Sequence, residues 1–111
     1  MGKVRVGVIG LGEVAQIIHL PILRALGDRY EIGAVCDISP ALLNTVGDEY
    51  SVRSRYLDAA ELCAQSDLDA VFVLNSDEYH SECAIAAARN GKHVLVEKPM
   101  CLTMSEAKAI A

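Results

Sequence analysis

The stretch KVRVGVIGLGEVA, residues 3–15, decides the fold. Its first seven residues are rich in β-branched side chains, which is typical of a strand. Gly10 and Gly12 then interrupt the pattern, and a predicted helix over residues 13–26 follows directly. A strand that passes through a glycine turn straight into a helix is the opening unit of an α/β protein.

Strands and helices alternate along the rest of the chain, with short joints. Further strands are predicted at residues 30–37, around Tyr56, at 68–74 and at 94–97, and further helices from Pro40, after Asp58, at 78–90 and from Thr103. Because parallel strands need crossover connections, this alternation predicts a doubly wound parallel sheet, a Rossmann fold of five strands with helices on both faces. We expect one domain over residues 1–111, since no linker or repeat interrupts the pattern.

Local signals predict several helix ends. Ser39 and Asp58 are expected N-cap residues, and Pro40 suits the first position of a helix. Gly91 stands where a left-handed residue would end the helix before it. Pro21 lies inside the first predicted helix and removes one backbone hydrogen bond there, so we expect a kink or break near residues 19–20.

Composition excludes several classes of protein. Ten basic and fifteen acidic side chains give a net charge of −5 without any Lys/Arg cluster, which argues against nucleic-acid binding. No apolar run is long enough to span a membrane, and the N-terminus lacks the pattern of a secretory signal. The four cysteines show no C-x-x-C spacing and no metal-ligand pattern, so we expect reduced thiols that pack as small apolar side chains in a cytoplasmic protein.

The glycine turn also carries a functional signal. Gly10, Gly12 and Ala15 form G-x-G-x-x-A, with Leu11, Glu13 and Val14 between them. Gly10 permits a tight turn, Gly12 lets a pyrophosphate approach the backbone, and Ala15 lets the helix pack closely on the strand. The pattern therefore predicts dinucleotide binding by residues 10–15, against the alternative of a purely structural turn. Glu13 suits the helix N-terminus but would repel a diphosphate unless its side chain points to solvent.

Asp37 is the last residue of the second predicted strand, 22 residues after Ala15. An acid at this place accepts hydrogen bonds from the adenosine ribose and repels the 2′-phosphate of NADP, so we predict NAD, with NADP as the less favoured cofactor. The alternative is an ordinary aspartate that initiates the turn DISP, residues 37–40.

The loops after the fourth and fifth predicted strands are polar. Asn75, Ser76 and His80 follow the fourth strand, Glu97 ends the fifth, and Lys98 and Pro99 follow it. Carboxyl ends of parallel strands meet at one edge, where α/β proteins bind ligands. A lysine there can stabilise charge that develops on a reacting oxygen. The alternatives are a loop-bonded His80 and a solvated Glu97–Lys98 pair.

Taken together, GVIGLGEVA, AVCDISP, His80 and GKHVLVEKP resemble the N-terminal domain of the glucose–fructose oxidoreductase / inositol dehydrogenase / rhizopine-catabolism (Gfo/Idh/MocA) family. The resemblance implies an NAD(P)-dependent oxidoreductase that acts on sugars, polyols or related secondary alcohols. It implies that Lys98 is catalytic. The other implied cofactor contacts are Gly10, Leu11, Gly12, Glu13, Val14, Ala15, Asp37, Asn75, Ser76, His80, Glu97 and Pro99.

The chain departs from the family pattern in two ways. The family motif T-P-N-x-x-H reads here as residues 75–80, NSDEYH, which leaves the nicotinamide-side contacts of this loop open. The family's larger substrate domain is also missing, so we expect little turnover from this chain alone and weak binding of NAD.

The alternative to an oxidoreductase domain is a nucleotide-sensing or regulatory module of the same family. A methyltransferase would share the glycine loop but has no use for Glu97, Lys98 and Pro99. Without a sixth strand, the fifth would be an open edge prone to self-association.

Overall fold

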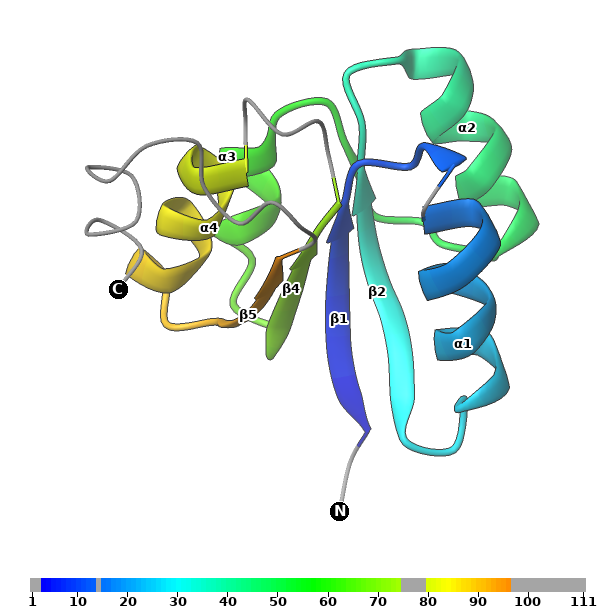
Figure 1. Cartoon of the computed structure of the whole chain (residues 1–111), viewed down its shortest axis with the longest axis horizontal. Helices are drawn as coiled ribbons and strands as arrows, with labels where there is room; N and C mark the ends of the chain where they lie inside the picture. The colour runs from blue at the N-terminus through cyan, green and yellow to red at the C-terminus, as the bar shows by residue number, and fades with distance from the viewer. Residues whose placement is uncertain (1–2, 14, 75–79, 97–111) are drawn as a thin grey trace.

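The computed structural model describes residues 3–13, 15–74 and 80–96, and within them the predicted parallel sheet is confirmed (Figure 1). Its order is β3-β2-β1-β4-β5, and every adjacent pair is parallel. This is the order of a Rossmann fold, in which the chain starts at the centre and winds outward in both directions. The strands are β1 (Val4–Ile9), β2 (Tyr30–Cys36), β3 (Arg55–Tyr56), β4 (Ala70–Val73) and β5 (His93–Val96).

The strand register brings the carboxyl ends of the strands to one edge. Ile9 at the end of β1 pairs with Cys36 at the end of β2 and with Val73 at the end of β4. Val73 in turn pairs with Val96, the last residue of β5. The loops that follow β1, β2, β4 and β5 therefore leave the sheet side by side.

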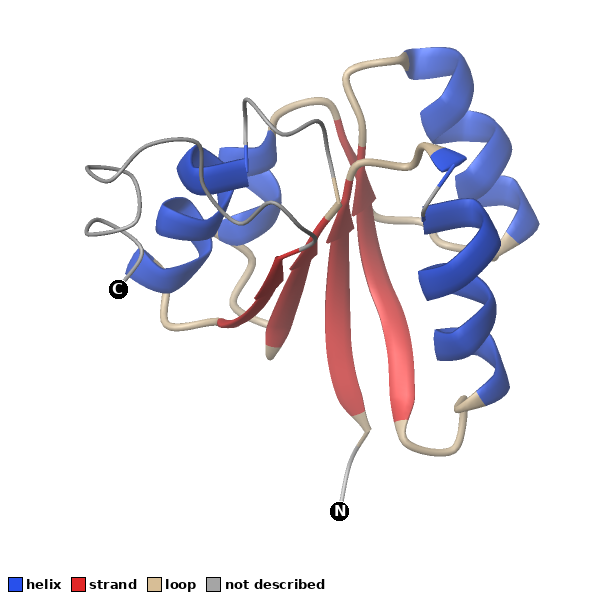
Figure 2. Ribbon diagram, in the orientation of Figure 1, coloured by secondary structure: helices blue, strands red, loops and turns tan. Residues whose placement is uncertain are grey.

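Helices cover both faces of the sheet, as predicted (Figure 2). One face carries the π-helix η1 (Ala15–His19) with α1 (Leu20–Ala25) and α2 (Pro40–Glu49). The other face carries α3 (Ala59–Cys63) and α4 (His80–Arg89). None of these described helices has the length and apolar character needed to cross a membrane.

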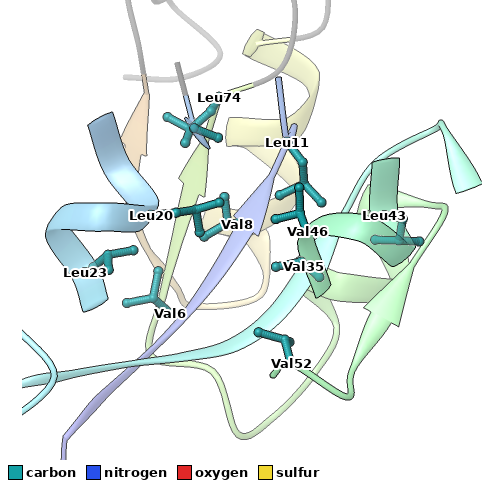
Figure 3. Packing of buried hydrophobic residues seen from close by; sticks show 11 residues of the cluster. Val6, Val8, Leu11, Leu20, Leu23, Val35, Leu43, Val46, Val52 and Leu74 are labelled. Atoms are coloured by element: carbon teal, nitrogen blue, oxygen red, sulfur yellow. The ribbon is translucent and has the colours of Figure 1, made fainter. Parts of the chain in front are cut away.

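Alternation along the strands divides the core into two clusters. Val6 and Val8 of β1 face Leu20, Leu23 and Val46 of the first helical layer (Figure 3). The intervening residues Gly7 and Ile9 turn toward the second layer, where Leu62, Cys63 and Ala87 pack. Burial on both faces explains why β1 and β4 read as nearly continuous apolar runs.

The predicted helix ends are confirmed. The Ser39 hydroxyl accepts a hydrogen bond from the Leu42 N–H at 3.3 Å, and the Asp58 carboxylate accepts one from the Ala60 N–H at 3.0 Å. Gly91 has φ of 73° after α4, in the left-handed region that favours glycine. The expected irregularity near residues 19–20 is also present, because η1 changes to α1 there. Pro21 has no N–H to donate to Ile17, which accounts for the change.

Several predicted boundaries were wrong by one or two residues. β2 ends at Cys36 rather than at residue 37, β4 covers Ala70–Val73 rather than 68–74, and α4 ends at Arg89 rather than at residue 90, while its predicted start at residue 78 lies outside the described residues. β5 begins at His93 rather than at residue 94. The helix predicted from Thr103 lies outside the described residues.

Candidate dinucleotide site

Gly10 makes the turn from β1 into the first helix. Its φ is 91°, a left-handed conformation that L side chains rarely adopt, so the turn requires glycine here. Its N–H donates to the carbonyl oxygen of Cys36 at 2.8 Å. The glycine turn is thereby attached to the end of the neighbouring strand β2.

Gly12 begins the helical segment and leaves open space above the loop. Its carbonyl oxygen accepts from the Gln16 N–H at 3.0 Å, the first helical hydrogen bond. Among the described residues, a Cβ added at Gly12 would meet no atom within 4 Å. Close packing against these residues therefore does not require glycine here, and the open space is compatible with a ligand that approaches the backbone.

The other loop residues divide between the core and solvent. Leu11 is fully buried at 0% exposure and Ala15 is 1% exposed, so both side chains hold the loop against the sheet (Figure 3). Glu13 is exposed, which is the orientation that a diphosphate beside this loop requires. Val14 lies outside the described residues.

Asp37 links the glycine turn to the loop after β2. One carboxylate oxygen accepts from the Leu11 N–H at 2.8 Å, and the other accepts from the Ser39 N–H at 2.8 Å. A carboxylate oxygen has two lone-pair sites, so both atoms keep capacity for a ligand hydroxyl. The structure thus brings the two strongest sequence signals, the glycine turn and Asp37, into direct contact.

A pocket of about 610 Å³ opens beside these two elements. Its wall includes two carboxylates, and none of the described residues that line it is a lysine or arginine. Two apolar side chains stand at its rim, with Ile38 85% exposed and Leu57 54% exposed. The lining residues are Ile9, Gly10, Gly12, Cys36, Asp37, Ile38, Leu57, Asp58, Ala59, Ala60, Leu74, Cys83 and Ala86.

The sequence motif missed much of this pocket. Asp58 was predicted only as a helix cap, and Ile38 and Leu57 had no predicted role. Ile38 is the second residue after β2, and Leu57 directly follows β3. A position just after a strand, at the carboxyl edge of the sheet, is the signal that could have identified both residues.

The thiols of this region are buried. Cys36 and Cys83 line the pocket, and Cys36, Cys63 and Cys83 are free cysteines. Burial raises the pKa of the Cys36 thiol to about 12 and that of the Cys63 thiol to about 11. Their burial agrees with the prediction that they pack as small apolar side chains; Cys101 lies outside the described residues.

The nicotinamide side of the predicted site is mostly outside the described residues. This applies to Asn75, Ser76, Glu97, Lys98 and Pro99. The backbone of His80 begins α4. The strands that precede these residues, β4 and β5, end side by side at the edge that carries the glycine turn.

Comparison with known proteins gives one family and a consistent fold. The family model described as "Oxidoreductase family, NAD-binding Rossmann fold" (GFO_IDH_MocA) matches residues 4–111. Myo-inositol 2-dehydrogenase of Thermotoga maritima is 36% identical over 102 residues, which cover 92% of this chain and 30% of that protein.

Two solved structures extend the comparison to bound cofactors. The WlbA dehydrogenase of Bordetella pertussis, in complex with NADH and UDP-GlcNAcA, matches with TM-score 0.91 and 28% identity over 98% of this chain and 33% of that one. KijD10, a 3-ketoreductase of Actinomadura kijaniata in complex with TDP-benzene and NADP, matches with TM-score 0.88 and 29% identity over 98% and 34%.

The chain spans about a third of the length of these relatives. One of the two structures contains NADH and the other NADP, so the likeness alone favours neither cofactor. The family match, however, covers nearly the whole chain and agrees with the order of the sheet and the position of the glycine turn. The chain belongs to the Gfo/Idh/MocA oxidoreductase family and represents its NAD-binding Rossmann fold.

Proposed function

We propose that this chain is the NAD-binding domain, over residues 1–111, of an oxidoreductase acting on a sugar, polyol or related secondary alcohol. The observation that carries the proposal is the hydrogen bond from the Leu11 N–H to the Asp37 carboxylate at 2.8 Å. It joins a glycine turn suited to pyrophosphate with an acid suited to ribose, beside a pocket of about 610 Å³. The substrate class is supported by relatives named for inositol and for sugar nucleotides.

The proposed binding mode follows the carboxyl edge of the sheet. The pyrophosphate lies over residues 10–15, where Gly12 leaves the backbone open and Glu13 faces solvent. Asp37 accepts hydrogen bonds from the adenosine ribose. The adenine ring then reaches the rim of the pocket, where Ile38 and Leu57 offer apolar surface.

NAD is the proposed cofactor rather than NADP. Asp37 and Asp58 both line the pocket, and no described lining residue carries a positive charge. A 2′-phosphate placed beside Asp37 would be repelled by about 1 kcal/mol per pair of unit charges at 4 Å, even in bulk water. Two phosphate charges therefore predict at least about a tenfold preference for NAD.

Hydride transfer is assigned to the other end of the cofactor. When bound, the nicotinamide would exchange a hydride at C4 with the carbinol carbon, and the hydroxyl proton would pass to or from a base in the part of the protein that binds the substrate. Lys98 stabilises the charge on the reacting oxygen, and Glu97, Pro99, Asn75, Ser76 and His80 shape the nicotinamide side of the site. These roles rest on the family resemblance. A further part of a longer protein would bind the substrate, so we expect little turnover from this chain alone.

An enzymatic role is favoured over a regulatory one. Two of the relatives reported above are named as dehydrogenases and the third as a ketoreductase. A cytoplasmic location remains part of the proposal, supported by buried thiols at Cys36, Cys63 and Cys83.

The proposal is tested by titrating the chain with NADH and with NADPH, followed by the fluorescence anisotropy of the nicotinamide. The chain contains no tryptophan, so protein emission does not interfere. We expect saturable binding of NADH and at least about tenfold weaker binding of NADPH. Failure to bind either cofactor would refute the proposed function, and a preference for NADPH would refute the assignment of Asp37.

A further inference from the structure

Asp58 occupies two structural roles at once. It is the N-cap of α3, and one oxygen of its carboxylate accepts from the Ala60 N–H at 3.0 Å. The same residue lines the dinucleotide pocket, next to Leu57 and across from Ile38 on the loop after β2. The cap bond restrains the carboxylate, since it holds one of the two oxygens at the start of the helix.

The second oxygen of Asp58 has no partner among the described protein groups. An ionised carboxylate accepts hydrogen bonds and donates none. The pocket therefore offers a restrained acceptor beside the apolar rim formed by Ile38 and Leu57. A ligand group that suits this arrangement is a flat apolar ring that carries a hydrogen-bond donor at its edge.

The proposed binding mode brings such a ring to this place. Asp37 N–H donates to the Tyr56 carbonyl oxygen at 3.2 Å, which holds the ends of β2 and β3 together. A base attached to a ribose at Asp37 consequently reaches Leu57 and Asp58, the two residues that follow Tyr56. Adenine carries an exocyclic amino group, a donor, where hypoxanthine and guanine carry a keto oxygen, an acceptor.

We propose that Asp58 selects the base of the dinucleotide, with its free carboxylate oxygen accepting a hydrogen bond from the 6-amino group of adenine. The inference rests on the proposed function, since it requires a dinucleotide in this pocket. A keto oxygen at the same place faces a carboxylate oxygen with no hydrogen between them. Asp58 thus favours adenine through an attractive contact and disfavours keto bases through a repulsive one.

The experiment compares NADH with reduced nicotinamide hypoxanthine dinucleotide, in which a keto oxygen replaces the 6-amino group of the base and N1 carries a hydrogen. The unchanged chain is expected to bind NADH about tenfold more tightly, the effect of one exposed hydrogen bond to a charged group. Asp58→Asn keeps a capping oxygen for Ala60 and presents an amide N–H₂ to the base. We expect this variant to lose the preference for NADH or to favour the hypoxanthine dinucleotide.

Two further variants separate base selection from folding and from net charge. Asp58→Ser retains a capping hydroxyl but has no second oxygen, so the two dinucleotides should bind it with affinities within about twofold. Glu61→Gln removes a charge from an exposed residue of α3 that does not line the pocket, and should keep the tenfold preference. Thermal unfolding of each variant shows that the fold is retained; should Asp58→Asn not fold, Asp58→Ser alone decides.

The outcomes distinguish the inference from the function on which it rests. Equal binding of both dinucleotides by the unchanged chain would overturn the role of Asp58 and leave the proposed function standing. If Asp58→Asn and Asp58→Ser keep the full preference for NADH, the role of Asp58 is likewise overturned and the proposed function stands. Binding of neither dinucleotide by the unchanged chain would overturn the proposed function itself.

Discussion

Replacement of Gly12 by alanine should weaken cofactor binding at least about tenfold without weakening the fold. The added methyl group meets no atom of the described residues within 4 Å, so it clashes with none of them. Alanine restricts the unfolded chain more than glycine and so stabilises by about 0.4–1 kcal/mol. It is a poorer N-cap, which costs about the same amount because Gly12 accepts the first helical hydrogen bond. The two effects nearly cancel, and we expect Tm to change by less than about 4 °C.

Binding should respond very differently. The methyl group of Gly12→Ala would occupy the space through which the pyrophosphate reaches the loop backbone. We expect the Kd for NADH to rise at least about tenfold, which corresponds to about 1.4 kcal/mol. The affinity is measured by nicotinamide anisotropy, and the stability by thermal unfolding followed by circular dichroism.

Two other glycines provide matched controls. Gly91→Ala introduces a side chain at φ of 73° with no atom within 4 Å, at the end of the sheet away from the pocket. It should cost about 1–2 kcal/mol of stability and leave the NADH affinity unchanged. Gly10→Ala, at φ of 91°, should reduce both the stability and the NADH affinity. The reasoning is refuted if Gly12→Ala binds NADH within twofold of the unchanged chain, or if Gly91→Ala loses affinity as strongly as Gly12→Ala.

Two further predictions concern stability and association. Unfolding returns the pKa of the Cys36 and Cys63 thiols from about 12 and about 11 to 9.0, so their contribution to stability is complete below pH 9 and is lost as the pH rises toward 11–12. The urea concentration at the midpoint of unfolding should fall as the pH rises through this range, and it should fall less steeply in Cys63→Ala. Equal pH slopes in the two proteins would contradict the raised pKa of the Cys63 thiol. β5 pairs only with β4 in the described sheet, and Val94 and Leu95 are 36% and 40% exposed, so we expect concentration-dependent association by light scattering. Leu95→Lys should reduce it, and an unchanged chain that stays monomeric at high concentration would refute it.

The topology was predictable from sequence because its signals are local. Ser39, Asp58 and Gly91 each act within three or four residues, and each does so in the structure as predicted. The alternation of strands and helices then leaves few possible arrangements of a parallel sheet. Strand boundaries were less predictable, because ladder pairing depends on the neighbouring strand and not on the apolar run itself.

The features that sequence did not reveal arise from contacts between distant elements. Gly7 belongs to no motif, yet a Cβ there would lie 2.7 Å from Leu62 and 2.9 Å from Leu68, so glycine allows α3 and the segment before β4 to approach β1. Leu11 stands between two glycines of a binding motif, but its side chain is fully buried. The pocket rim at Ile38 and Leu57 forms only when the ends of β2 and β3 meet. None of these contacts has a periodicity that a single sequence displays.

The hydrogen bonds of Asp37 decide which substitutions can report on cofactor binding. Its two oxygens hold the N–H groups of Leu11 and Ser39, and Leu11 is fully buried, so water has little access to the N–H that its loss would leave unpaired. An unsatisfied buried N–H costs about 1–3 kcal/mol, a large share of the stability of a small domain. Removal of Asp37 would therefore loosen the glycine turn and weaken the ribose contact together, and a lost affinity could not be attributed to either. The cofactor preference is best measured on the unchanged chain as the ratio of NADH to NADPH affinity. Gly12→Ala tests the pyrophosphate position, because a side chain there would contact none of the residues that the structure describes.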